Sequence, residues 1–142
     1  HFYERKDNKV HWQISAPDGS EHIVGHFQKL CTASEGYDEL PVKGLDKAAR
    51  YRLQCKTQSL FIKRLGGLVK HVMPIELNPD GFILRTANKF FAMPDGAEDF
   101  EASGAALMSG IKLNNQFLGT GYNGKLHMFG DFGSAIYTIE KS

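Results

Sequence analysis

Three short strings in the C-terminal part of the sequence match motifs that catalyse reactions or bind nucleotides elsewhere. Residues 119–124 (GTGYNG) fit the glycine-rich loop of dinucleotide-binding proteins, residues 131–133 (DFG) fit the metal-binding triplet of protein kinases, and residues 109–112 (SGIK) fit the nucleophile motif of penicillin-binding proteins. Each motif needs partners: a helix after the glycine-rich loop, the other kinase motifs upstream, or further Ser and Lys motifs. Gly130 and Gly133 disfavour a helix after residue 124, and the other partners do not occur in the sequence. All three matches therefore predict turns or chance similarity, with neither a nucleotide nor a catalytic site.

Two histidines have a spacing that occurs in metal sites. His22 and His26 are four residues apart, which suits a metal ion on a helix. On a strand, however, four residues span about 13 Å, too far for two ligands of one zinc ion. We expect surface histidines or histidines with ordinary hydrogen bonds, and no metal or cofactor site.

Acidic residues cluster at Asp95, Glu98, Asp99 and Glu101. A pair of carboxyl groups about 5–9 Å apart can hydrolyse a glycosidic bond. An acidic loop between two strands is more often solvated, so we predict no catalytic residue there. Cys31 and Cys55 leave two alternatives open, buried reduced thiols or a disulfide.

Alternation of apolar and polar residues predicts the elements that would position these side chains. Residues 10–14 and 22–30 predict a hairpin around the turn formers at 16–20, with Val10, Trp12 and Ile14 buried on one face. Further strands are predicted at 50–54, 68–73, 82–86, 125–129 and 134–139, and a short helix at 105–108. About eight to ten short strands with no long helical period predict an all-β fold, a single antiparallel β-sandwich of Greek-key or jelly-roll type.

Composition limits the partners of the chain. The 142 residues carry a net charge of +1 without a long run of like charge, which gives no footprint for nucleic acid or an anionic membrane. No apolar run approaches the ~18 residues of a membrane span, and the first residues are too polar for a signal peptide. We expect a cytoplasmic protein that contacts neither membrane nor nucleic acid.

Several segments in order resemble family 36 α-galactosidases. The strings at 103–108 (SGAALM), 110–113 (GIKL), 119–123 (GTGYN) and 130–134 (GDFGS) resemble the closing segment of these enzymes. Trp12, residues 24–28 (VGHFQ) and residues 44–46 leading to Tyr51 resemble the start of their C-terminal β-domain, and residues 66–70, 78–81 and 93–96 are similar to some bacterial members. The similarity covers nearly the whole chain.

The resemblance implies that residues 1–142 are the C-terminal β-sandwich domain of a larger enzyme. In this family the catalytic aspartates lie on a (β/α)₈ barrel that precedes the β-domain, and the enzymes hydrolyse terminal α-galactosides such as melibiose and raffinose with retention of configuration. We therefore expect no catalytic residue, no cofactor and no enzymatic activity in this chain alone.

The expected partner is the catalytic barrel of the same parent chain, with contacts between copies as a further expectation. The domain should then carry an exposed apolar face. The alternative is an autonomous carbohydrate-binding module, which would present a row of exposed aromatic side chains.

Overall fold

The computed structural model describes residues 2–6, 8–30, 38–56, 58–60, 93–95, 98–113, 115–117, 127–129 and 131–142. In these residues twelve strands accompany one five-residue helix, so the predicted all-β class is confirmed. The elements are β1 (Phe2–Lys6), β2 (Lys9–Ser15), β3 (Glu21–Gln28), β4 (Glu39–Leu40), β5 (Arg50–Cys55), β6 (Gln58–Leu60), β7 (Met93–Asp95), β8 (Asp99–Ser103), α3 (Gly104–Met108), β9 (Ile111–Lys112), β10 (Asn115–Phe117), β11 (His127–Phe129) and β12 (Ser134–Lys141).

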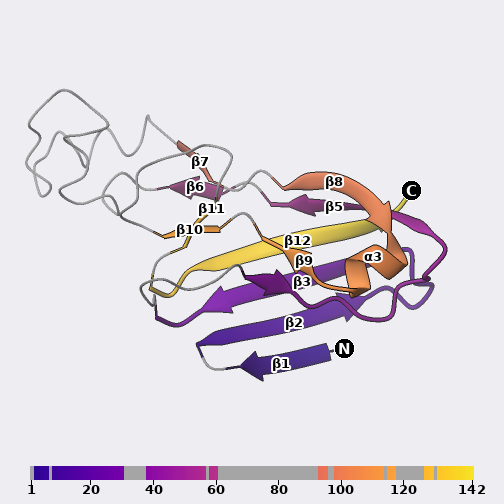
Figure 1. Cartoon of the computed structure of the whole chain (residues 1–142), viewed down its shortest axis with the longest axis horizontal. Helices are drawn as coiled ribbons and strands as arrows, with labels where there is room; N and C mark the ends of the chain where they lie inside the picture. The colour runs from indigo at the N-terminus through magenta and orange to yellow at the C-terminus, as the bar shows by residue number, and fades with distance from the viewer. Residues whose placement is uncertain are drawn as a thin grey trace, which may run out of the picture.

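A six-stranded sheet forms the main layer of the molecule, in the order β1-β2-β3-β12-β5-β8 (Figure 1). Every neighbouring pair in it is antiparallel. The last strand, β12, lies in the centre between β3 and β5, and the first strand, β1, lies at one edge. The C-terminal strand is thus inserted between two strands that precede it in sequence.

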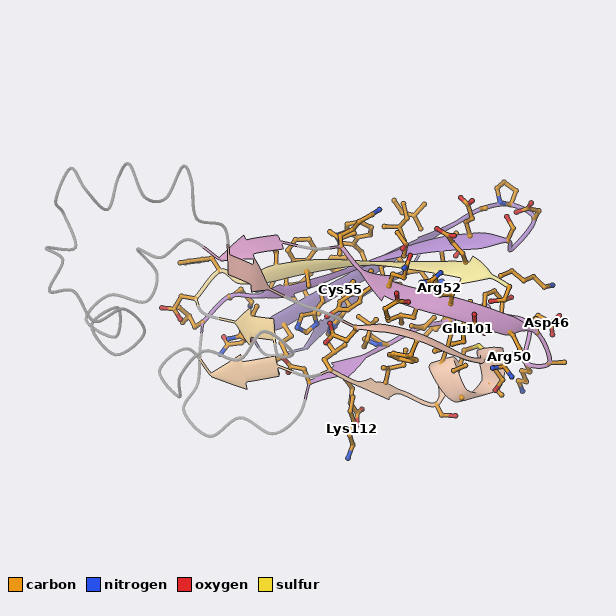
Figure 2. The ribbon with its side chains drawn as sticks, turned by 90° about the horizontal axis from the view of Figure 1, so that it is seen from above. Asp46, Arg50, Arg52, Cys55, Glu101 and Lys112 are labelled. Carbon is orange, nitrogen blue, oxygen red and sulfur yellow. The ribbon has the colours of Figure 1, made fainter. Side chains whose placement is uncertain are left out.

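The second layer consists of the short β4–β9 pair and α3, which lie on one side of the main sheet (Figure 2). Lys112 on β9 points away from the main sheet in this view. The two layers enclose one core, and this arrangement confirms the sandwich. The core comprises Val24, Leu40, Val42, Leu45, Tyr51, Leu53, Cys55, Leu107, Ile111, Leu113, Ala135, Tyr137 and Ile139.

Two small sheets accompany these layers. β6 pairs with β7 antiparallel, whereas β10 pairs with β11 parallel. The parallel pair departs from the purely antiparallel arrangement that the sequence predicts.

Most of the predicted elements that fall in the described residues are present. The hairpin of β2 and β3 closes through residues 16–20, where Gly19 has a φ of 69° that glycine adopts without strain. The predicted short helix is α3; its N-cap Ser103 accepts a hydrogen bond from the Ala106 amide. The strands predicted at 68–73 and 82–86 lie outside the described residues.

The prediction of which face of β2 is buried is wrong. His11 and Gln13 point into the core side of the sheet, whereas Val10 and Trp12 are half-buried on the other side and Ile14 is 46% exposed. The segment packed over β2 explains this arrangement, because the backbone groups of Lys43 bind the Gln13 amide and the Asp38 carboxylate faces His26, partners that apolar side chains cannot replace. Polar residues consequently occupy the inner face of this strand.

Candidate functional site: a buried polar cluster under the first hairpin

Four charged or titratable side chains meet beneath β2 and β3. His11 and His26 are neighbours across the two strands, and Nε2 of His11 lies 2.6 Å from Nδ1 of His26. Nε2 of His26 lies 3.4 Å from Oδ2 of Asp38, and Nζ of Lys9 forms an ion pair with Oδ1 of the same carboxylate. His11, His26 and Asp38 are all buried. We name Lys9, His11, His26 and Asp38 the polar cluster.

The contacts of the polar cluster define where its protons lie. The Asp38 carboxylate only accepts hydrogen bonds, so the facing Nε2 of His26 carries the proton. The other nitrogen of the same ring, Nδ1, then accepts a hydrogen bond from Nε2–H of His11. Lys9 and Asp38 form the ion pair of the cluster.

A second buried network joins the same hairpin to the segment above it. The Gln13 amide donates from Nε2 to the Lys43 carbonyl at 2.7 Å and accepts from the Lys43 amide at 3.0 Å, as a neighbouring strand would. Nε2 of Gln13 also donates to Oγ of Ser15 at 2.9 Å. One side chain thus satisfies both backbone groups of Lys43 in a place where no sheet ladder reaches them.

His22 continues this second network as a neutral ring. Its Nε2–H donates to the Gly19 carbonyl at 3.3 Å, so its Nδ1 accepts from Oγ–H of Ser15 at 2.8 Å. Burial lowers the pKa of His22 below the usual 6.5, and the hydrogen bond to Gly19 opposes this shift. The edge of the ring also contacts Tyr51, with ring centroids 5.9 Å apart.

The polar cluster is suited to holding segments together and poorly placed for chemistry on a substrate. A carboxylate that orients an imidazole is half of a hydrolytic triad. Here, however, His26 has no exposed surface and His11 only 6%, so a substrate has no access to either ring. The cluster connects β2, β3 and the residue before β4, and sequence analysis identified only one of its members, His26.

His22 and His26 therefore lie on the inner face of β3 with hydrogen bonds to different partners, so of the two alternatives that the sequence left open the structure has the hydrogen-bonded one, not the surface one. Within the described part of the chain, no group of three or more His, Cys, Asp or Glu side chains is placed to hold a metal ion. Cys55 is buried on β5, where its Sγ lies 3.7 Å from the Lys56 carbonyl. Cys31 lies outside the described residues, so the pairing of the two cysteines stays open.

Two members of the acidic group at 95–101 lie on a strand instead of in a solvated loop. Asp99 and Glu101 lie on β8, next to Arg52 and Arg50 on the neighbouring strand, and Glu98 is buried. Arg52 donates two hydrogen bonds to Asp99, at 2.9 and 2.8 Å, and Gln54 donates a third at 3.1 Å. The Arg52 hydrogen bonds, followed by the one from Gln54, lower the pKa of Asp99 from 3.8 to about 2. The side chain of Asp95 is not among those described.

The lookalike strings adopt unrelated local structures where they are described. Residues 131–133 form a turn before β12; Phe132 there is 76% exposed and has a φ of 57°. Ser109 caps the C-terminal end of α3, and Lys112 lies three residues further on in β9. Residues 119–124 lie outside the described part of the chain. No helix among the described residues is long and apolar enough to cross a membrane.

Fold and site together define a class: an all-β sandwich whose buried titratable groups connect its own segments. The family model for the glycosyl hydrolase family 36 C-terminal domain matches residues 9–139, and the chain belongs to this family. No match was found among the curated proteins.

Two solved structures of α-galactosidases from Geobacillus stearothermophilus are similar to this chain. A variant of AgaA in complex with raffinose is 19% identical with a TM-score of 0.50, and AgaB is 20% identical with a TM-score of 0.49. The matches cover 96% and 95% of this chain, respectively, but only 11% of each enzyme. The chain thus corresponds to about a tenth of the length of these enzymes.

Proposed function

We propose that residues 1–142 form the non-catalytic C-terminal accessory domain of an α-galactosidase that hydrolyses terminal α-galactosides such as raffinose and melibiose with retention of configuration. The observation that carries the proposal is the family match over residues 9–139. The likeness in fold to the AgaA variant, which was captured with raffinose, agrees with it. The role of the domain is to pack against the catalytic domain of the same chain, and the parent enzyme acts in the cytoplasm.

The chemistry of the described carboxylates supports a non-catalytic role. A retaining glycosidase needs two carboxyl groups about 5–5.5 Å apart, one of them protonated near neutral pH to act as the acid. Asp99, with a pKa of about 2 beside Arg52, is ionised throughout that range. Asp38 is buried and forms an ion pair with Lys9, so a sugar cannot reach it.

Hydrolysis of a chromogenic α-galactoside tests this proposal. We expect turnover by the full-length parent enzyme and none by residues 1–142 alone, whose β content is checked by circular dichroism. Turnover by the isolated domain would refute the accessory role, and an inactive full-length enzyme would refute the assignment to α-galactosidases.

A carbohydrate-binding module remains the second candidate, because three aromatic side chains lie close together on the outside of the main sheet. Tyr3 is opposite Trp12 in the register of β1 and β2, and the rings of Trp12 and Phe27 have centroids 6.1 Å apart. Aromatic faces of this kind can stack on sugar rings. Titration calorimetry with galactose and raffinose distinguishes the two functions, since only the module should release or absorb heat on binding.

A further inference from the structure

The first hairpin of the molecule has its apolar residues on the side away from the core. On β3, His22, His26 and Gln28 face inward with Val24, whereas Ile23 is 42% exposed on the other side. β2 has the same arrangement, with His11 and Gln13 inside. A strand that folds against a single core normally has the reverse pattern, because burial of apolar surface stabilises the fold. The hairpin therefore has the pattern of a structure that buries its outer side as well.

We name the side of the main sheet opposite β4, β9 and α3 the outer face. Its apolar half lies on β1, β2 and β3 and consists of Tyr3, Trp12, Ile14, Ile23 and Phe27. Neighbouring strands bring these side chains together: Tyr3 is opposite Trp12, Val10 is opposite Phe27, and Ile14 is opposite Ile23. Three of the five are large apolar side chains with 42–65% of their surface exposed.

Gly25 allows two aromatic rings of the apolar half to lie against the backbone of β3. A Cβ at Gly25 would lie 2.7 Å from Cε2 of Phe27 and 2.7 Å from Cζ2 of Trp12, so the two rings lie across the backbone of β3. Only glycine permits this close approach. The rings consequently cover the strand and present a continuous apolar surface.

The other half of the outer face, on β5, β8 and β12, is charged. It consists of Arg50, Arg52, Asp99, Glu101 and Glu140. Arg52 is opposite both Glu101 and Glu140 in the sheet register and binds Asp99, so these side chains satisfy one another in solvent. One sheet thus presents an apolar half next to a charged half.

We infer that the apolar half of the outer face is the surface on which this domain docks against the preceding, catalytic domain of its parent chain. This inference rests on the proposed function. In AgaA, nine tenths of the chain lies outside the part that this domain matches, so a large neighbour within the same chain is available to cover the face. The first strand, β1, is the edge strand of the apolar half and supplies Tyr3.

The chemistry of the apolar half favours a protein surface over a sugar as its occupant. Sugar sites combine an aromatic platform with polar groups that bind the hydroxyls. Here Ile14, Ile23, Gly25 and Val10 lie between and beside the rings, and none of their side chains can form a hydrogen bond. Arg5 on the edge strand and Glu21 at the start of β3 lie on the same side of the sheet, at its margin, whereas the residues between them are apolar and aromatic. An apolar and aromatic centre is typical of a permanent interface.

Site-specific photo-crosslinking in the full-length parent enzyme tests the inference. A benzophenone amino acid replaces Ile14 or Ile23 in the apolar half, and Glu101 in the charged half is the matched control on the same face. After irradiation, peptide mass spectrometry identifies the crosslinked partner. We expect positions 14 and 23 to crosslink within one chain to residues preceding this domain, at a yield at least about tenfold above that of position 101.

Three results would overturn the inference. Crosslinks between two chains from positions 14 and 23 would make the face a contact between copies; equal yields at all three positions would show that nothing covers it. Quenching of Trp12 fluorescence by galactose or raffinose would make it a sugar platform. Turnover of a chromogenic α-galactoside by the same samples tests the proposed function separately, because an inactive enzyme with the expected crosslinks would refute only that function.

A substitution provides a second measurement on the same enzyme. Ile23→Lys places a charge in the apolar half, whereas Glu101→Lys changes the charged half by a comparable amount. We expect the half-life of galactosidase activity at elevated temperature to fall at least about fivefold for Ile23→Lys, and less than about twofold for Glu101→Lys. Equal half-lives of the two variants would contradict the docking surface.

Discussion

Replacement of Gly104 by alanine tests how the two layers of the sandwich meet. Gly104 is the first residue of α3, and its amide donates to the Ala49 carbonyl at 2.9 Å. A Cβ at this position would overlap the Asp46 carbonyl oxygen, and would lie 2.9 Å from the carbonyl carbon of that residue and 3.1 Å from Cβ of Leu45. The obstacle is mainly backbone, which cannot rotate away as a side chain does.

Two effects of this substitution have opposite signs. Helix propensity favours alanine over glycine by up to about 1 kcal/mol. The steric effect opposes it: relaxing 2.9 Å to an ordinary carbon–carbon separation of about 3.5–4 Å moves the two segments apart by roughly 0.6–1.1 Å. Overpacking of this kind costs about 1–3 kcal/mol, and the hydrogen bond to Ala49 adds about 0.5–1.5 kcal/mol if it breaks. We therefore expect Gly104→Ala to lower the free energy of unfolding by about 1–3 kcal/mol.

Urea denaturation followed by the fluorescence of Trp12, the single tryptophan of the sequence, measures this change. The matched control is Ala106→Gly on the exposed side of the same helix, where only propensity acts and the loss should not exceed about 1 kcal/mol. A Gly104→Ala protein as stable as the parent or more so would refute the close approach of α3 to Asp46.

Three further predictions concern the titratable residues. His26→Leu should lower the free energy of unfolding by about 1–3 kcal/mol, because His11 loses a buried hydrogen-bond partner and the buried Asp38 carboxylate loses the imidazole 3.4 Å away; urea denaturation that matches the parent protein would contradict this role. The pKa of His22 is below 6.5 in the folded state, so the unfolded state binds more protons as pH falls below 6.5, and stability must fall with it. The difference in urea midpoint between about pH 7.5 and 5.5 should accordingly be smaller in His22→Gln than in the parent protein. An unchanged difference would exclude His22 as a source of the pH dependence of stability. The stability that Asp99 contributes is present above pH 3.8 and is lost as pH falls towards about 2, so Asp99→Asn should flatten the pH dependence of the urea midpoint in that window. Gln54→Ala removes only the hydrogen bond that has the lesser effect on the pKa of Asp99, so it should flatten the pH dependence of the urea midpoint less than Asp99→Asn does. The same pH dependence in both variants would contradict the leading role of Arg52.

Among the described residues, sequence periodicity predicted several strands correctly, because alternation and turn residues are local signals, whereas β1 was not predicted and β8 was expected to be an acidic loop. The hairpin of β2 and β3, the strand β5, the central strand β12 and the helix α3 all fall where the pattern places them. The choice between the two faces of β2 could not be made in this way. A period of two distinguishes the two sides of a strand but does not say which side meets the segment at 38–43, and that segment is far away in sequence.

The side chains of the polar cluster could not be identified from the sequence for the same reason. Lys9, His11 and Asp38 carry no mutual spacing that would identify them, since β2 and the residue before β4 meet only in the folded sandwich. Two polar residues at alternating positions of β2, followed by two histidines at a spacing of four on β3, were the available signal. The sequence alone does not explain this signal. The structure does, because the Gln13 amide takes the place of a strand partner for the Lys43 backbone.

The inward polar residues and the outward apolar residues of the first hairpin have one physical origin. The segment at 38–43 presents the Lys43 backbone and the Asp38 carboxylate to β2 and β3, and both require polar partners, so the inner face there contributes less apolar burial than β5 and β12 do. Apolar side chains that cannot enter this core lie outside, where a neighbouring protein surface can remove them from water. The charged half lies on β12, β5 and β8, and the inner face of β12 and β5 is apolar again, with Tyr137, Tyr51 and Leu53 buried. The division of the outer face therefore follows the division of the core beneath it, and both mark β1, β2 and β3 as the part of the sheet that gains stability from a neighbour.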